Sequence, residues 1–305
     1  MRVLCLHGHG TSSDIFETQL SAIRNLLDES VEYVYIDGPV ESDRVRGWLA
    51  HILYMNFILT MARAGMSEMV PGPFFGWFSG FSPTQILETH TLVAEALEED
   101  GPFDAIFGFS QGATLALCYL LEHQIRHPDQ PPPVHFAVLF SCAGPAFSSD
   151  TNLARKIIHS LAPEDFERLR VAEVESQDTE AKDAFLATMR TALQLGGDNG
   201  FVVPADEIDQ WERASSSTRE QLMTRVFHPS LTATRVKIPT IHVLGDSDTA
   251  DVLEQAELCR GLCDPRSVER VAHSAAHDVP RKPDEARQVA EAIRAAEAEA
   301  CLMIY

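Results

Sequence analysis

The chain has 305 residues, of which 45% are hydrophobic and 23% are charged, so it is long enough for one large core and ordinary for a globular protein. Its 45 Asp and Glu residues outnumber 24 Lys and Arg residues, and the formal net charge of −21 argues against partners such as nucleic acid or an anionic membrane. The longest apolar run, 52–62, is too short to cross a bilayer, and the first residues read as a core strand rather than a secretory signal, so we expect a soluble, cytoplasmic protein.

The cysteines indicate a reducing compartment. Most of them fall within predicted strands and helices, which is typical of buried thiols rather than of a disulfide framework. Two of them are four residues apart on a predicted helix, but no second ligand pair accompanies them, so we expect no metal site and no cofactor. The six are Cys5, Cys118, Cys142, Cys259, Cys263 and Cys301.

Strands and helices alternate from the first residues onward. Residues 2–6 predict a strand, 14–28 a helix capped by Asp14, and 31–36 a second strand closed by Asp37-Gly38-Pro39, which together make a βαβ unit. Later strands are predicted at 103–107, 134–141, 238–244 and 267–272, and a last helix at 284–300. We therefore expect an α/β fold in a single domain, with a mostly parallel sheet of about six strands flanked by helices.

Two long insertions interrupt this alternation. Residues 40–81 lose periodicity and accumulate Gly, Pro and aromatic residues such as Trp48, Tyr54 and Phe57, which favours either a lid or pocket wall or a simple cover for the sheet. Ser82 and Pro83 then begin a helix to about Glu99. Residues 144–235 carry helical patterns near 151–171 and 179–195, with a glycine-rich break at 196–200, and predict a helical cap over the active site.

A single G-x-S-x-G motif, residues 108–112, lies between a predicted strand and a predicted helix. In a nucleophile elbow the serine occupies a sharp strand-to-helix turn, where small neighbours let the backbone fold tightly and leave the hydroxyl exposed. Ser110 is therefore the candidate nucleophile. Gln111 would begin the following helix, so its N–H can donate to an oxyanion.

The loop His7-Gly8-His9-Gly10 has two possible meanings. In a serine hydrolase, a glycine-rich turn after an early strand supplies a second oxyanion donor, here the N–H of His9. In a dinucleotide-binding protein, the same turn would cradle pyrophosphate and Asp37 would hold a ribose. The third glycine of that fingerprint is replaced by Ser13, and the nucleotide interpretation leaves Ser110 unexplained.

The remaining partners of a serine nucleophile follow later strands. Asp248 is the preferred acid, with Asp246 as the alternative, because the residue further along the turn can curl toward the histidine. His277 is preferred over His273, because it lies deeper in the loop before the last helix, and His242 reads as a core histidine inside a strand. The chain order Ser, Asp, His is that of α/β-hydrolases.

These stretches together resemble the fungal serine hydrolase (FSH) family. The resemblance rests on residues 1–10, Asp37-Gly38-Pro39, the motif around Ser110, residues 242–248 and His277-Asp278-Val279-Pro280, and it spans nearly the whole chain. It implies an α/β-hydrolase fold with Ser110, Asp248 and His277 at the positions of the triad. The long insertions depart from shorter members, so acyl-chain specificity does not carry over.

The resemblance also implies a polyketide-type substrate. Fungal members release acyl chains from a synthase carrier domain or hydrolyse esters of the product, so we expect cleavage of an acyl thioester or ester. An acyl-carrier domain is then a candidate partner, although the charge of −21 is poorly suited to docking an acidic domain. The alternatives are a small-molecule carboxylesterase and a non-catalytic protein that keeps the pocket for a ligand.

Overall fold

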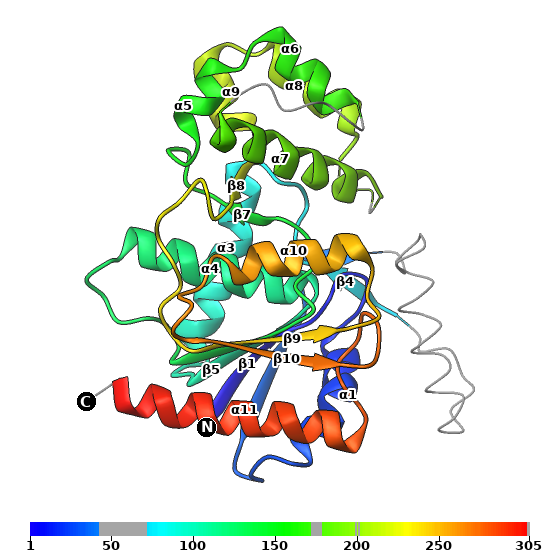
Figure 1. Cartoon of the computed structure of the whole chain (residues 1–305), viewed down its shortest axis with the longest axis vertical. Helices are drawn as coiled ribbons and strands as arrows, with labels where there is room; N and C mark the ends of the chain where they lie inside the picture. The colour runs from blue at the N-terminus through cyan, green and yellow to red at the C-terminus, as the bar shows by residue number, and fades with distance from the viewer. Residues whose placement is uncertain (43–71, 172–178, 199, 201, 304–305) are drawn as a thin grey trace.

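The computed structural model describes residues 1–42, 72–171, 179–198, 200 and 202–303. Its centre is a six-stranded sheet in the order β10-β9-β6-β5-β1-β2, in which every neighbouring pair is parallel (Figure 1). This confirms the predicted parallel sheet. The strands are β1 (Arg2–Leu6), β2 (Glu32–Ile36), β5 (Ala105–Phe109), β6 (Phe136–Phe140), β9 (Thr240–Gly245) and β10 (Val268–His273).

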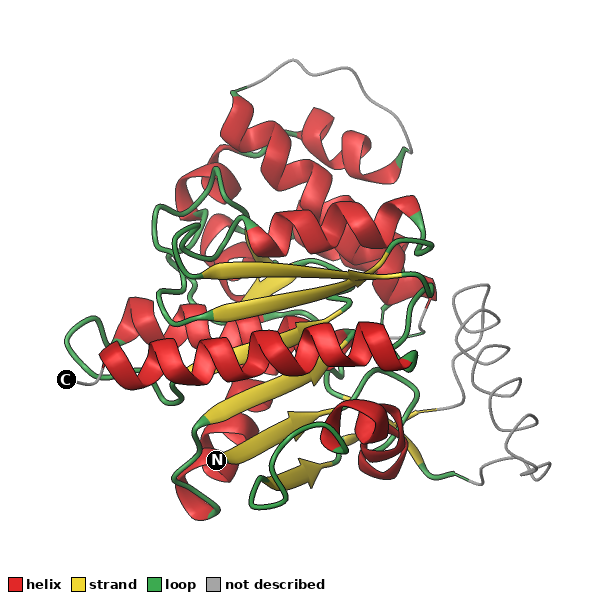
Figure 2. Cartoon of the chain, turned by 60° about the horizontal axis from the view of Figure 1, so that its bottom comes forward, coloured by secondary structure: helices red, strands yellow, loops and turns green. Residues whose placement is uncertain are grey.

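Helices cover both faces of the sheet. On one face lie α1 (Ser13–Arg24) and α11 (Pro283–Met303), and in Figure 2 α11 crosses in front of the strands and ends near the C-terminus. On the other face lie α3 (Pro83–Glu99), α4 (Gln111–Arg126) and α10 (Ala250–Arg260) (Figure 1). Both faces are therefore buried, which explains why the central strands read as continuous apolar runs.

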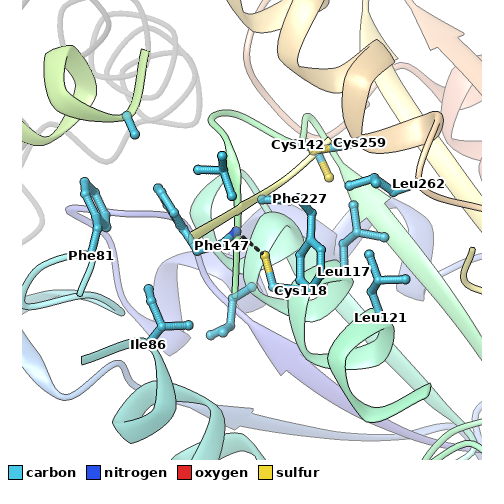
Figure 3. Packing of buried hydrophobic residues seen from close by; sticks show 14 of the residues in the cluster. Phe81, Ile86, Leu117, Cys118, Leu121, Cys142, Phe147, Phe227, Cys259 and Leu262 are labelled. Atoms are coloured by element: carbon cyan, nitrogen blue, oxygen red, sulfur yellow. Dashed lines mark hydrogen bonds between the residues drawn. The ribbon is translucent and has the colours of Figure 1, made fainter. Parts of the chain in front are cut away.

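Alternate residues of each strand enter different cores. Val3 and Cys5 belong to the core beneath α1 and α11, whereas Leu4 and Leu6 belong to the core beneath α3 and α4. This follows from the two-residue period of a strand. The second core extends outward to Phe147, whose N–H lies 3.0 Å from the Cys118 sulfur (Figure 3).

The ends of the first insertion pair with each other. β3 (Val40–Ser42) and β4 (Phe74–Gly76) form a short antiparallel ribbon. Trp48, Tyr54 and Phe57 lie outside the described residues. After β4 the chain turns inward, and Trp77, Phe78 and Phe81 are buried.

The second insertion forms a helical layer beyond another two-stranded ribbon. β7 (Ala146–Ser148) pairs with β8 (Arg225–Phe227), and the helices between them lie at the end of the molecule opposite α11 (Figure 1). The helical patterns predicted near 151–171 are present as two helices, and the second begins at Pro163, a residue that favours the first turn of a helix. These are α5 (Arg155–Ser160), α6 (Pro163–Arg170), α7 (Glu180–Asp198), α8 (Pro204–Arg213) and α9 (Ser216–Leu222).

Two predicted helix starts can be compared with the structure. Ser82 caps α3 and forms a capping box with Gln85, as predicted. The prediction that Asp14 caps the first helix is wrong, because the side chain of Ser12 accepts the N–H of Ile15 and Asp14 lies inside the first turn. There its carboxylate still complements the positive end of the helix dipole.

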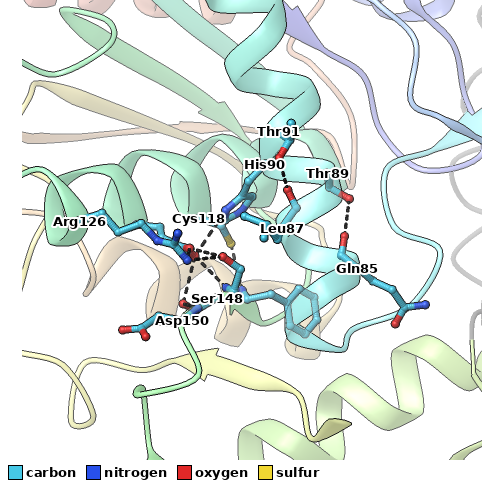
Figure 4. A network of polar contacts seen from close by, with 12 residues as sticks. Gln85, Leu87, Thr89, His90, Thr91, Cys118, Arg126, Ser148 and Asp150 are labelled. Atoms are coloured by element: carbon cyan, nitrogen blue, oxygen red, sulfur yellow. Dashed lines mark hydrogen bonds and ion pairs between the residues drawn. The ribbon is translucent and has the colours of Figure 1, made fainter. Parts of the chain in front are cut away.

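A buried charged network joins α3, α4 and β7 (Figure 4). Glu122 accepts hydrogen bonds from the Ser148 hydroxyl (3.1 Å) and the Ser149 N–H (2.8 Å), and it pairs with Arg126 (2.6 Å) and with His90 (3.4 Å). Burial alone would raise the pKa of Glu122, but hydrogen bonds from His90 and Ser149 together with the nearby charge of His90 lower it to about 2. The network thus holds an ionised carboxylate between the core and the second insertion.

None of the described helices is long and apolar enough to span a bilayer.

Candidate active site

Ser110 occupies a tight turn between β5 and α4. Its backbone has φ 53° and ψ −116°, a conformation that a residue with a side chain rarely adopts. A Cβ on Gly108 would lie 2.5 Å from the Ala113 Cα, and one on Gly112 would lie 2.3 Å from the Leu6 carbonyl oxygen. The motif needs glycine at both places because other backbone passes there. The strand, turn and helix that the sequence predicts around Ser110 are present.

His277 lies between Ser110 and Asp248. Its Nδ1 is 2.8 Å from the Asp248 Oδ2, and its Nε2 is 2.8 Å from the Ser110 Oγ. Because a carboxylate can only accept, Nδ1–H donates to Asp248, and the lone pair of Nε2 is left to accept from the serine hydroxyl. The His277 and Asp248 side chains are only 1% and 2% exposed, so water screens this pair little. The arrangement can take up the serine proton as the oxygen attacks a carbonyl.

The two alternative residues lie elsewhere. Asp246 is exposed, and its backbone N–H donates to the carbonyl of His273 (2.8 Å). His273 ends β10 and is buried, which lowers its pKa. His242 is buried inside β9, as expected; burial lowers its pKa to about 4, and its Nε2 is 3.5 Å from the Cys263 sulfur. Among the described residues, it is Asp248 and His277 that hydrogen bonds connect to Ser110.

The loop that carries His277 is held from two sides. Gly245 ends β9, and a Cβ there would lie 2.2 Å from the Ala276 carbonyl oxygen, so a side chain would push the loop away. On the other side Asp278 accepts from the Val279 N–H (2.8 Å) and from the Gln19 amide of α1 (3.3 Å). Sequence reasoning missed Gln19 as a supporting residue, because only the tertiary fold brings α1 beside this loop.

A neutral histidine shapes the glycine-rich loop after β1. The Gly38 N–H donates to His7 Nε2 (2.9 Å), so the ring proton is on Nδ1, which donates to the Gly8 carbonyl (2.7 Å). Burial lowers the pKa of His7, in agreement with a neutral ring. A Cβ on Gly8 would lie 3.3 Å from the Ser110 Cβ, so the loop lies directly against the serine.

His9 and Gln111 both lie close to Gly76. A Cβ on Gly76 would be 2.6 Å from the His9 Nδ1 and 3.6 Å from the Gln111 Oε1. Burial, with a smaller contribution from His7, lowers the pKa of His9 to about 4, so its ring is neutral near pH 7. The loop residue and the first residue of α4 are thus neighbours next to Ser110.

Asp37, Cys259 and Cys263, which the sequence analysis considered for other kinds of site, can also be located in the structure. Asp37 accepts the N–H of Ser13 at the start of α1 (2.7 Å), so its carboxylate adds a second hydrogen bond to the N-terminus of the helix that Ser12 caps. Cys259 and Cys263 are buried free thiols, and no group of three or more His, Cys, Asp or Glu side chains among the described residues could hold a metal ion.

Comparison with known proteins shows the family of the chain. The family model described as serine hydrolase (FSH1) matches residues 1–289. The chain is 32% identical to the esterase alnB of Emericella nidulans over 289 residues, which cover 94% of this chain and 93% of the relative. It is 27% identical to the hydrolase FUB4 of Fusarium oxysporum over 299 residues, which cover 96% and 97% of the two chains.

Solved structures are more distant. Arabidopsis thaliana SOBER1 is 13% identical, with a TM-score of 0.46 and coverage of 97% of this chain and 98% of that one. The family model and the curated relatives extend over nearly the full chain, and the fold is that of α/β-hydrolases. The chain therefore belongs to the serine hydrolase (FSH1) family.

Proposed function

We propose that this enzyme cleaves acyl esters or thioesters through an acyl-enzyme on Ser110. The single observation that carries the proposal is the pair of 2.8 Å contacts that join Ser110, His277 and Asp248. His277 takes the hydroxyl proton while Ser110 attacks the acyl carbonyl, and Asp248 orients the ring and stabilises its charged form. His277 then gives the proton to the departing alcohol or thiol. A water molecule attacks the acyl-enzyme while His277 takes its proton, and His277 returns this proton to the Ser110 oxygen as the acid leaves.

The N–H groups of His9 and Gln111 are the proposed oxyanion donors. The position of Gln111 at the start of α4 supports this role, because the first N–H groups of a helix have no partner within it. The contact between Gly8 and Ser110 supports the role of the loop that carries His9. A preorganised donor of this kind typically lowers the barrier by about 3 kcal/mol.

We propose that α5–α9 act as a cap beside this site. A cavity of about 280 Å³ lies between the cap and the start of α3, close to the lower end of the size range of ligand pockets, about 300 Å³, and Ser110, Asp248 and His277 are not among its lining residues. Its lining includes Phe81 and Gln85 from the core and Leu193 and Trp211 from the cap. The acyl group is proposed to be of polyketide type, because the resemblance of the sequence to the fungal serine hydrolase family implies such a substrate.

A small-molecule oxygen ester is the first candidate substrate. The relative alnB is named an esterase, and the net charge of −21 disfavours docking of an acidic carrier domain. A carrier-bound thioester is the second candidate. The ratio of kcat/KM for one acyl group, presented as a matched thioester and oxygen ester, separates the two: a strong thioester preference indicates release from a carrier, and equal rates or an ester preference indicate a free intermediate.

Loss of the serine hydroxyl tests the proposed chemistry. Ser110→Ala should lower kcat by about four to six orders of magnitude and abolish labelling by a fluorophosphonate probe. Ser21→Ala is the control, because Ser21 is an exposed serine on α1 and the variant should keep both activity and labelling. Substantial activity in Ser110→Ala would show that the nucleophile is a different residue, and a wild-type protein that resists labelling would favour a non-catalytic binding protein.

A further inference from the structure

The two proposed oxyanion donors belong to separate parts of the chain. His9 lies in the loop after β1, and Gln111 begins α4. Donors that act together on one oxygen must be held within about 0.5 Å of their working positions. Some other element must therefore fix the loop relative to the helix.

β4 is hydrogen-bonded to the loop that carries His9. The Gly10 N–H donates to the Phe75 carbonyl (2.9 Å), and the Phe75 N–H donates to the Thr11 carbonyl (2.8 Å). These paired backbone hydrogen bonds form an isolated antiparallel bridge between Thr11 and Phe75. The residues directly after His9 are thus held by β4.

Trp77, two residues after Phe75, is hydrogen-bonded to the first residue of α4. The Trp77 N–H donates to the side-chain Oε1 of Gln111 (2.9 Å), and its indole N–H donates to the His7 carbonyl (2.7 Å). Trp77 is 0% exposed; its hydrogen bond to His7 is buried, and the one to the half-buried Gln111 is partly buried. Segment 75–77 therefore contacts the loop and the start of α4 at the same time.

We infer that the side chain of Gln111 is a positioning group for the oxyanion hole. Its carbonyl oxygen accepts the Trp77 N–H and so fixes segment 75–77 relative to the start of α4. The same segment is hydrogen-bonded to the loop of His9, so the loop and the helix are positioned relative to each other. The role is separate from that of the Gln111 backbone N–H, and it rests on the proposed function, since it presumes that both N–H groups serve the oxyanion. Gly76 leaves room for the His9 ring, whose Nδ1 would lie 2.6 Å from any Cβ at that position.

Gln111→Met tests the inference, because methionine has a similar length and lacks the strong acceptor. We expect kcat to fall about 10- to 100-fold, since small displacements of catalytic groups cost about that much. KM should change less than about threefold, because the oxyanion hole acts mainly on the transition state. The affinity for a trifluoromethyl ketone analogue, which forms a tetrahedral oxyanion with the serine, should fall by the same factor as kcat.

Gln124→Met is the matched control. Gln124 lies on the same helix, is also half-buried, and donates one side-chain hydrogen bond to the backbone carbonyl of Arg235 (2.7 Å). It should retain kcat and analogue affinity even if both variants melt at a similarly lowered temperature. Gly76→Ala, whose Cβ would lie 2.6 Å from the His9 Nδ1 and so displace the loop, should reproduce the loss of kcat if Gln111→Met does not fold.

The inference is overturned if Gln111→Met keeps the kcat and analogue affinity of Gln124→Met, or if its loss appears in KM alone. Either result with an inactive Ser110→Ala would leave the proposed hydrolysis intact and remove only the positioning role. Activity in Ser110→Ala would instead contradict the proposed function itself.

Discussion

The backbone of Ser110 adopts a strained conformation because the close packing of the neighbouring backbone forces a tight turn there. The residues on both sides of it pass so close to other backbone that only glycine fits at positions 108 and 112. Strain of this kind persists where the neighbouring structure compensates for it. At the scale of single residues, the site thus depends on glycine at positions 108 and 112 as much as on the three side chains that form hydrogen bonds.

Glu122 offers a prediction at the same scale. Its pKa of about 2 lies below the usual 4.5, so the unfolded chain binds more protons than the folded chain between these pH values. The contribution of Glu122 to stability is therefore complete above about pH 4.5 and is lost as the pH falls through about 2. Glu122→Gln should lower the free energy of unfolding by up to about 3 kcal/mol at pH 7. The difference from wild type should shrink at pH 3, as measured by denaturant titration.

Glu257→Gln is the control for this experiment. Glu257 pairs with Arg260 on the surface of α10, where both side chains are exposed. Such pairs contribute about 0–1 kcal/mol, so this variant should remain near wild type at both pH values. A loss in Glu122→Gln that does not depend on pH would mean that packing, rather than the ionised carboxylate, explains its effect.

At the scale of elements, α3 begins where its sequence predicts. The Ser82 hydroxyl accepts the Gln85 N–H, and the Gln85 side chain accepts the Ser82 N–H (3.1 Å). These two contacts satisfy backbone donors that the first turn leaves unpaired. The start of α3 is important because Phe81, just before it, lines the cavity between core and cap, and Trp77 contacts His7 and Gln111.

Ser82→Ala should therefore destabilise the protein by about 1 kcal/mol. Thr91→Ala on the same helix is the comparison, because its hydroxyl donates to the Leu87 carbonyl in the helix interior (2.8 Å) and caps nothing. Replacing such a threonine by alanine should be neutral or slightly stabilising. Equal losses in the two variants, measured by thermal or denaturant unfolding, would rule out the capping box as the cause.

At the scale of the whole molecule, the net charge of −21 has a measurable consequence. Like charges on the surface repel one another more strongly in the compact state than in the expanded unfolded chain. Raising the ionic strength from about 10 mM to 150 mM shortens the Debye length from about 30 Å to about 8 Å, which screens this repulsion. We expect the Tm at pH 7.5 to rise over this range.

Sodium chloride and choline chloride should have the same effect, because screening depends on ionic strength rather than on the cation. A Tm that falls with salt would show that attractive ion pairs outweigh the repulsion. A rise with only one of the two salts would point to binding of a particular ion.

The sequence by itself determined the parallel sheet, the turn around Ser110 and the start of α3. Each depends on local signals: apolar runs in the strands, small residues at fixed spacing in the turn, and a serine followed three residues later by glutamine at the helix. It did not reveal β7 and β8, because their pairing joins residues far apart in the chain and each strand is only three residues long. The helices α8 and α9 were also missed, because both are short and mostly polar: only Ile208 and Trp211 of α8 are buried, and no residue of α9 is.

Only the tertiary structure decided which acid and which histidine approach Ser110. Asp246 and Asp248 share one turn, and His273 and His277 share one loop, so local pattern could rank them but could not place them. The choice depends on Gly245, which lets the backbone of residues 275 and 276 pass close to the end of β9. The contact of Trp77 with Gln111 was equally invisible in the sequence, because a hydrogen bond between residues 34 positions apart is set by the packing of the whole fold.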